Sequence, residues 1–409
     1  MDILLTAGRS EKINEKITIS GSKSESNRLL ILQQLFPEIS IENVSDSDDS
    51  VHLKHALSSK EEWIDIGHAG TAMRFLVGYF ASKENSEVVL TGSERMQNRP
   101  IGILVDALRD LGADISYEAK EGYPPVRIKG TRITKQKVQI NGNVSSQYIS
   151  SLILMGTHLE NGLNIELIGA ITSVPYIEMT LSLLSQLGIQ TSFEGNSIQV
   201  HSVKNISKQT IVVESDWSSA SYFYSIIALS EIGSEIELSA YRKDSLQGDS
   251  CLATIYTHFG VETEFSDNSI RLRKVQKTNS DSLNIDLKNA PDIAQTIAVT
   301  AFGLGISCVL TGLHTLKIKE TDRLEALQEE LTKLGAKIRV TNDSLHLSVS
   351  SEMNAQVAIK TYNDHRMAMA FAPLALKVPI QIQNAEVVSK SYQKFWADMQ
   401  QIGMLIKEL

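Results

Sequence analysis

The chain has 409 residues, 42% of them hydrophobic, which is enough for a large core and too long for one ordinary domain. Its 39 Lys and Arg residues against 48 Asp and Glu residues give a net charge of −9, which argues against a general nucleic-acid-binding surface. The two cysteines lie in no metal-binding or redox spacing, and the N-terminal residues have no sustained apolar segment. We therefore expect a cytoplasmic protein without a signal or transit peptide.

The first strong helix signal lies at residues 21–32. Residues 21–28 read Gly-Ser-Lys-Ser-Glu-Ser-Asn-Arg and lead into the apolar run 29–32 with no Gly or Pro to interrupt a helix. A helix N-terminus offers free backbone N–H groups and the positive end of the helix dipole, and Lys23, Ser24 and Arg28 add to that field. The segment therefore predicts an anion site, although a serine-capped helix with solvated charges is the simpler interpretation of this one segment taken alone.

Further along the chain the predicted helices are of two kinds. Helices of the first kind are apolar on nearly every face, which is typical of buried helices, and they begin near Ser24, Gly70, Ser146, Ser218, Asp292 and His365. Helices of the second kind are amphipathic, and each ends in a turn glycine followed by a short alternating strand. Successive turn glycines lie 68 to 76 residues apart, at Gly112, Gly188, Gly260, Gly335 and Gly403.

The apolar stretch 293–313 has the length of a membrane span. Polar residues and glycines interrupt it, so we expect a buried helix, a glycine turn and a strand in its place, and no membrane segment.

The repeat predicts an α/β (α+β) fold of two halves, each with three units in which strands surround a buried central helix. If the central helices of each half run parallel, their N-termini share one surface and form an electropositive region. Capping explains the serines and aspartates at these positions but not Lys23, His365 and Arg366. The polar residues at the helix starts are Lys23, Ser24, Gly70, Thr71, Ser145, Ser146, Gln147, Asp292, Asp364, His365 and Arg366.

Seven motifs in a fixed order resemble the 5-enolpyruvylshikimate-3-phosphate synthase family over almost the whole chain. Besides residues 21–28 they are 69–74 (Ala-Gly-Thr-Ala-Met-Arg), 95–100 (Arg-Met-Gln-Asn-Arg-Pro), 145–147 (Ser-Ser-Gln), 291–292 (Pro-Asp), 319–323 (Lys-Glu-Thr-Asp-Arg) and 362–369 (Tyr-Asn-Asp-His-Arg-Met-Ala-Met). The resemblance implies two domains, each of three βαβαββ units around parallel buried central helices. It places residues 21–213 in one domain and residues 1–20 plus 214–409 in the other, with the active-site cleft between them.

The resemblance also implies a reaction. Family members transfer the enolpyruvyl group of phosphoenolpyruvate to the 5-hydroxyl of shikimate 3-phosphate and release phosphate, through a tetrahedral ketal, in chorismate and aromatic amino acid biosynthesis. Such a site needs an acid, a base and cations, because the enol carbon must be protonated and the hydroxyl deprotonated. We expect no metal, no cofactor, no nucleic-acid or membrane partner, and a monomer.

Site residues carry over from the family position by position. The residues implied to be catalytic are Lys23, Asp292, Glu320 and His365. Those implied to bind shikimate 3-phosphate are Lys23, Ser24, Arg28, Ser145, Ser146, Gln147, Ser173, Asp292 and Lys319. Those implied to bind phosphoenolpyruvate are Lys23, Gly70, Arg99, Gln147, Arg323, Arg366 and Lys390. Which carboxylate makes which proton transfer stays open, and Arg99 and Arg323 taken alone are equally explained as surface ion pairs.

Some positions depart from the family pattern. His68 stands where asparagine is usual, Phe75 where proline is common, and Val174 where lysine is frequent. Near Lys390, the pair at 385–386 is Ala-Glu in place of a frequent Asp-Pro. The short segment 46–65 predicts one unit with a thinner outer layer.

Three other functions fit the sequence less well. UDP-N-acetylglucosamine enolpyruvyl transferase shares the fold and the donor but uses a loop cysteine, and neither Cys251 nor Cys308 lies in such a loop. A non-catalytic anion-binding protein would have no use for Asp292 and Glu320 among the cations. A nucleotide-dependent phosphoryl transferase would be expected to show a Gly-x-x-x-x-Gly-Lys-Ser/Thr loop, which the sequence lacks.

Overall fold

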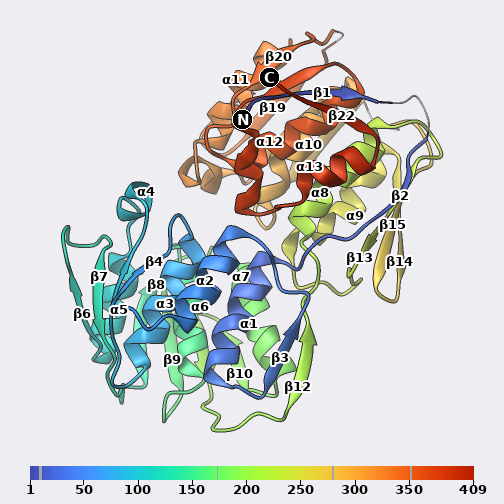
Figure 1. Cartoon of the computed structure of the whole chain (residues 1–409). Coiled ribbons are helices and arrows are strands. Elements are labelled where there is room, and N and C mark those ends of the chain that lie inside the picture. Colours follow the sequence, from blue (N-terminus) through green and yellow to red (C-terminus); the bar gives the residue numbers. More distant parts are fainter. Residues whose placement is uncertain (9–11, 173, 279–280, 351) are drawn as a thin grey trace. The chain divides into compact units, whose positions relative to one another are not determined.

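The computed structural model describes residues 1–8, 12–172, 174–278, 281–350 and 352–409. The chain divides into two compact units (Figure 1). The continuous unit is Gly21–Val213, and the split unit is Met1–Ser20 together with Glu214–Leu409. The chain therefore passes between the units twice, and its first two strands complete sheets of the split unit.

Each four-stranded sheet joins one parallel strand pair to two antiparallel strands. In the sheet β4-β5-β7-β6, for example, β4 and β5 are parallel, whereas β7 is antiparallel to both β5 and β6. A parallel pair requires a crossover connection, and the buried central helix supplies it. An outer helix then leads into the antiparallel strands, so that the order strand, helix, strand, helix, strand, strand is repeated.

The continuous unit contains two four-stranded sheets and one two-stranded sheet. The first sheet is β4 (Trp63–Asp65), β5 (Glu87–Thr91), β7 (Val126–Lys129) and β6 (Asp114–Tyr117); the second is β10 (Thr191–Glu194), β11 (Ser197–Val200), β9 (Leu163–Ile168) and β8 (Lys137–Asn141); the third is β12 (Gln209–Val212) and β3 (Ile39–Glu42). Its helices are α1 (Lys23–Leu35), α2 (Asp48–Ser58), α3 (Gly70–Ser82), α4 (Glu94–Gln97), α5 (Gly102–Leu111), α6 (Ser146–Gly156) and α7 (Val174–Gln186). The two-stranded sheet belongs to the repeat that contains the short segment 46–65, and this repeat keeps an outer helix, α2.

The split unit contains three four-stranded sheets. They are β14 (Val261–Ser266), β15 (Ser269–Lys274), β13 (Glu235–Ser239) and β2 (Asn14–Ile17); β16 (Ser282–Asp286), β17 (Ser307–Thr311), β19 (Leu345–Ser348) and β18 (Lys337–Val340); and β20 (Val357–Ile359), β21 (Ile380–Ile382), β1 (Ile3–Ala7) and β22 (Met404–Glu408). The α-helices are α8 (Trp217–Leu229), α9 (Leu252–Ile255), α10 (Ala294–Leu304), α11 (Arg323–Lys333), α12 (His365–Phe371) and α13 (Phe395–Gln401). The 3-10 turns are η1 (Gly248–Cys251), η2 (Tyr256–Phe259), η3 (Pro291–Ile293), η4 (His314–Ile318), η5 (Ala372–Leu376) and η6 (Ala385–Lys390). Figure 1 shows β1, in blue, beside β22, in red.

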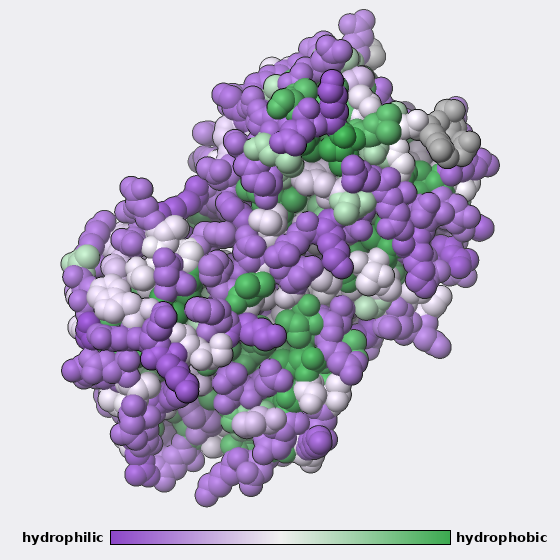
Figure 2. Space-filling view, in the orientation of Figure 1, coloured by the Kyte–Doolittle hydropathy of each residue, from purple (hydrophilic) through white to green (hydrophobic). Residues whose placement is uncertain are grey.

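The central helices are buried, as their apolar composition predicts. Every residue of α3 except Thr71 is buried, and every residue of α8 except Ser218. Hydrophilic residues cover most of the visible face, with apolar residues in small groups (Figure 2). Thr71 and Ser218, each in the first turn of its helix, are thus the residues at which these two otherwise buried helices meet solvent.

The turn glycines adopt the left-handed backbone conformation that ends a helix. Their φ angles lie between 75° and 105° in all five predicted positions, at Gly112, Gly188, Gly260, Gly335 and Gly403. Within 293–313 the predicted order is confirmed: α10 ends at Leu304, Gly305 caps it with a φ of 71°, and β17 follows. In the described part of the chain, no helix has both the length and the apolar character needed to cross a membrane.

Candidate active site

The start of α1 carries the first group of predicted site residues. Ser22 caps the helix, because its side chain accepts a hydrogen bond from the backbone N–H of Glu25. Lys23 and Ser24 form the first turn and are half-buried, so both remain within reach of solvent. The serine cap of the simpler interpretation is therefore present, and Lys23 lies beside it at the positive end of the helix dipole.

Arg28 lies one turn further along α1 and is only 2% exposed. Its Nε donates to Thr180 Oγ1 at 2.7 Å, and its Nη2 donates to Ser150 Oγ at 3.1 Å. The guanidinium lies over the ring of Phe75, 5.4 Å from the centroid. Burial lowers the pKa of Arg28 to about 10. No ion pair joins Arg28 to a carboxylate among the residues that the structure describes, and the hydrogen-bond acceptors around its guanidinium are neutral oxygens.

The start of α3 brings two further arginines together. A Cβ added to Gly70 would lie 2.9 Å from Cζ of Arg99, so the Arg99 guanidinium rests directly against the glycine. Arg74 is buried and donates to the Gly70 carbonyl at 3.0 Å. Burial and then the charge of Arg99 lower the pKa of Arg74 to about 10. Two guanidinium groups at one helix N-terminus make a strongly anion-attracting position.

The start of α6 lies next to the start of α3. Ser145 caps α6, and Gln147 Nε2 donates to Thr71 Oγ1 at 3.2 Å, which joins the first turns of the two helices. Ser146 is buried in the same turn. The predicted site residue Ser173 lies outside the described residues.

In the split unit, Asp292 is surrounded by cations. Its Oδ1 lies 2.8 Å from Arg323 Nη1 and 3.3 Å from Lys319 Nζ, and its Oδ2 lies 3.3 Å from Arg366 Nη2. Burial alone would raise the pKa of Asp292, but Arg366, Lys319 and Arg323 together hold it well below its usual range. Asp292 is therefore a carboxylate that stays ionised at neutral pH.

Arg323, at the start of α11, is the centre of this cluster. It is 1% exposed, and its three nitrogens contact three carboxylates. Besides Asp292, its Nη2 lies 2.8 Å from Glu320 Oε2 and its Nε lies 2.7 Å from Asp364 Oδ2. Burial opposes its charge, yet these carboxylates raise the pKa of Arg323 above its usual range. The guanidinium thereby fixes the positions of Asp292 and Glu320 relative to each other.

Arg366 links the starts of three central helices. It lies in α12, contacts Asp292 before α10, and donates from Nη2 to Ser218 Oγ of α8 at 3.2 Å. The Ser218 hydroxyl in turn donates to Asp249 in a short hydrogen bond. Burial and the neighbouring Asp292 raise the pKa of Asp249 to about 6.

The remaining predicted residues lie around the same helix. His365 is buried, and its Nδ1 lies 4.0 Å from Asp364 Oδ1. Lys390 ends η6, and its Nζ donates to the carbonyl of Asn363 at 2.7 Å. The split unit thus brings Asp292, Lys319, Glu320, Arg323 and Arg366 into one cluster, with Lys390 bound to the loop before α12.

Sequence reasoning assigned no role to three groups of this cluster. Asp364 caps α12 and binds Arg323; its place before His365 in the 362–369 motif was the signal that could have identified it. Ser218 accepts a hydrogen bond from Arg366 and donates one to Asp249, and no local sequence pattern connects these two residues with Arg366. In the continuous unit, His68, where the family usually has asparagine, lies 3.6 Å from Asp48 Oδ2.

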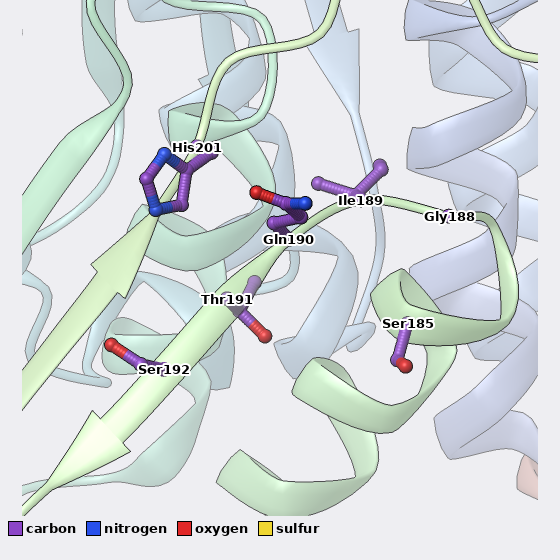
Figure 3. A pocket seen from close by; sticks show the side chains of 7 residues that line it. All are labelled: Ser185, Gly188, Ile189, Gln190, Thr191, Ser192 and His201. Carbon is purple, nitrogen blue, oxygen red and sulfur yellow. The ribbon is translucent and has the colours of Figure 1, made fainter.

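An open pocket of about 510 Å³ lies elsewhere in the continuous unit (Figure 3). Its lining comes from the end of α7, the Gly188 turn, β10 and His201, and it is polar. The described residues that line it include no predicted site residue, and His201 is the one titratable side chain among them. We assign it no part in the chemistry.

Comparisons with known proteins give the family of the chain. The family model of EPSP synthase (3-phosphoshikimate 1-carboxyvinyltransferase) matches residues 51–399. The chain is 46% identical to the 3-phosphoshikimate 1-carboxyvinyltransferase of Bacteroides fragilis (strain YCH46) over 97% of each chain, and 35% identical to that of Haemophilus influenzae (strain ATCC 51907) over 94% of this chain and 96% of the relative.

Solved structures show the same fold. The EPSP synthase of Acinetobacter baumannii covers 100% of both chains with a TM-score of 0.81 at 21% identity. The enolpyruvyl transferase NikO of Streptomyces tendae covers 99% of this chain and 98% of its own, with a TM-score of 0.74 at 13% identity. With the family model matched over most of its length, this chain belongs to the EPSP synthase (3-phosphoshikimate 1-carboxyvinyltransferase) family.

Proposed function

We propose that this protein transfers the enolpyruvyl group of phosphoenolpyruvate to the 5-hydroxyl of shikimate 3-phosphate, with release of phosphate, in aromatic amino acid biosynthesis. Family membership supports the reaction, and the observation that carries it in this chain is the cluster of Asp292 and Glu320 on Arg323, with Lys319 and Arg366 beside them. The reaction passes through addition of the hydroxyl and elimination of phosphate.

The two substrates are polyanions, and the two units hold different kinds of cation. Arg28 and Arg74 are buried without a carboxylate ion pair among the described residues, which suits them to binding a phosphate or to supporting groups that do. We assign shikimate 3-phosphate to Lys23, Ser24, Arg28, Ser145, Ser146, Gln147, Ser173, Asp292 and Lys319. We assign phosphoenolpyruvate to Lys23, Gly70, Arg99, Gln147, Arg323, Arg366 and Lys390. On this proposal both units serve one reaction.

The charges around Asp292 suggest how the proton transfers are divided. Asp292 is held ionised, so we assign it the role of base toward the 5-hydroxyl. Glu320 pairs with Arg323 and is 35% exposed, so solvent reaches it, and we assign it the protonation of the donor methylene. When the anionic donor occupies Arg323 and Arg366, these cations share their charge with it, and Asp292 becomes more basic at the stage that needs a base.

Two residues complete the catalytic proposal. Lys23, at the start of α1, assists the departing phosphate as a cation and proton donor. His365 acts through Asp364, because its ring is buried beside that carboxylate. The free cysteines support a cytoplasmic location, and we propose a monomer, which light scattering after size-exclusion chromatography tests.

Phosphate release tests the proposed function directly. Purified protein is mixed with phosphoenolpyruvate and either shikimate 3-phosphate or UDP-N-acetylglucosamine, and phosphate is followed with time. We expect phosphate release when the acceptor is shikimate 3-phosphate and none when it is UDP-N-acetylglucosamine. The Asp292→Asn variant should lose the release seen with shikimate 3-phosphate. Release with the nucleotide sugar in place of shikimate 3-phosphate would assign the chain to the other enolpyruvyl transfer, and release with neither acceptor would contradict the proposal.

A further inference from the structure

The two residues before Asp364 have an unusual backbone. Tyr362 and Asn363 have φ angles of 53° and 55°, in the left-handed region. Asparagine tolerates this conformation, whereas a bulky residue such as tyrosine rarely adopts it. Such backbone persists only where the surrounding structure holds it, and it is frequent at functional sites. The pair lies directly before the residues that cap and begin α12.

Contacts on both sides hold this bend. Glu330 of α11 is fully buried, and its carboxylate accepts from the Tyr362 hydroxyl at 2.6 Å and from the Lys360 backbone N–H at 3.3 Å. Lys333 Nζ, 2.6 Å from the same carboxylate, balances its charge. On the other side, Lys390 Nζ donates to the Asn363 carbonyl at 2.7 Å. We call Glu330 and Tyr362 the latch.

The latch and the anion-binding arginines belong to the same elements. Helix α11 begins with Arg323 and carries Glu330 two turns later. Asp364, which follows the bend, accepts from Arg323 Nε at 2.7 Å and from the Arg366 backbone N–H at 2.9 Å. The bend therefore sets where α12 starts relative to α11, and so where Arg366 lies relative to Arg323.

We propose that Glu330 and Tyr362 are positioning residues for phosphoenolpyruvate, because they hold the left-handed bend that aligns Arg366 and Lys390 with Arg323. The inference rests on the proposed function, in which these three cations bind the donor. A guanidinium pairs with a carboxylate or phosphate only in a fixed planar geometry, so a small shift of α12 costs donor affinity. Shikimate 3-phosphate, which we assign mainly to α1 and α6, depends on the latch only through Asp292, which Arg366 contacts, and so less than phosphoenolpyruvate does.

Three substitutions at one position separate conformation from contact. Tyr362→Phe removes only the hydroxyl, and we expect the KM for phosphoenolpyruvate to rise about tenfold, with a much smaller change in the dissociation constant of shikimate 3-phosphate. Tyr362→Ala and Tyr362→Gly both remove the whole side chain, but only glycine adopts a positive φ without cost. We expect the KM of the glycine variant to lie closer to the wild-type KM than that of the alanine variant. At most positions a glycine substitution is the more disruptive of the two, so this order would be the reverse.

A matched control and a second measurement complete the test. Tyr224→Phe also removes one part-buried tyrosine hydrogen bond in the same unit, to Thr263 at 2.9 Å, and should leave the KM unchanged. Amide hydrogen exchange of residues 360–366 needs no turnover and should be faster in Glu330→Gln and Tyr362→Phe than in Tyr224→Phe. Equal exchange in all three, or an alanine variant as good as glycine, would overturn the inference. If Glu330→Gln and Tyr362→Phe exchange faster but the wild-type protein releases no phosphate, the latch is supported and only the proposed function is contradicted.

Discussion

Replacing Gly70 with alanine tests how the start of α3 contributes to donor binding. Gly70 is the first residue of α3 and is not in the left-handed region, so the backbone itself accepts alanine. The added Cβ would lie 2.9 Å from Cζ and 3.1 Å from Nη2 of Arg99, closer than a Cβ normally approaches another atom. Because Arg99 is a long, flexible side chain, we expect its guanidinium to move and the helix to stay.

The size of the effect follows from what Arg99 loses. A hydrogen bond to a charged group contributes about 1.5–3 kcal/mol, and each 1.4 kcal/mol is a factor of ten, so the KM for phosphoenolpyruvate should rise by about 10- to 100-fold. Glycine in a helix costs about 0.5–1 kcal/mol relative to alanine, so the free energy of unfolding should be unchanged or slightly higher. Shikimate 3-phosphate affinity should stay the same.

A double-mutant cycle decides whether Arg99 carries the effect. Steady-state kinetics are measured for Gly70→Ala, Arg99→Ala and the double variant, and the cost of Ala at position 70 should nearly vanish once Arg99 is absent. Gly102→Ala is the matched control: it also begins a helix of this unit, and its Cβ would meet Gly122 Cα at 3.3 Å. Additive effects would show that the methyl group meets the donor itself. No change in any variant would refute the assignment of Gly70 to the donor site.

Three further predictions concern the catalytic cluster. Lys23→Met, Asp292→Asn and Glu320→Gln should each lower turnover by about 10²- to 10⁴-fold with unchanged circular dichroism, and losses below tenfold at both carboxylates would remove the acid–base assignment. Asp249 has its pKa raised by burial from 3.8 to about 6, so the folded state loses stability as pH rises through 6. Asp249→Asn should therefore raise the free energy of unfolding at pH 8 by up to about 3 kcal/mol, from (6 − 3.8) × 1.36, and by less at pH 5; equal gains in urea titrations at both pH values would contradict this. Because arginines and lysines supply the positive charge, EDTA should not reduce phosphate release. A loss of phosphate release in EDTA that Mg²⁺ restores would contradict this prediction.

The residues of the candidate site were predictable only where a motif carried them. Helix starts such as Ser22–Arg28 and Ser145–Gln147 have local signals, because capping and the helix dipole act within one turn. Resemblance to the family supplied Arg323, Lys319 and Glu320, which composition would have left as surface charges. Asp249 and Glu330 had no such signal, since each acts on residues about 30 or more positions away.

The sequence by itself determined the repeated units. Periodicity of apolar residues separates buried from amphipathic helices, and a turn glycine marks each helix end, because backbone conformation and side-chain burial follow local pattern. Tertiary structure alone decided which charges meet. In the folded chain three carboxylates pair with Arg323, and the Arg99 guanidinium packs against Gly70. Tyr362 has a left-handed backbone, and its hydroxyl donates to Glu330. The physical reason is that pairing between charged groups depends on distances of a few ångströms between residues far apart in the chain, and only packing of the helices fixes those distances.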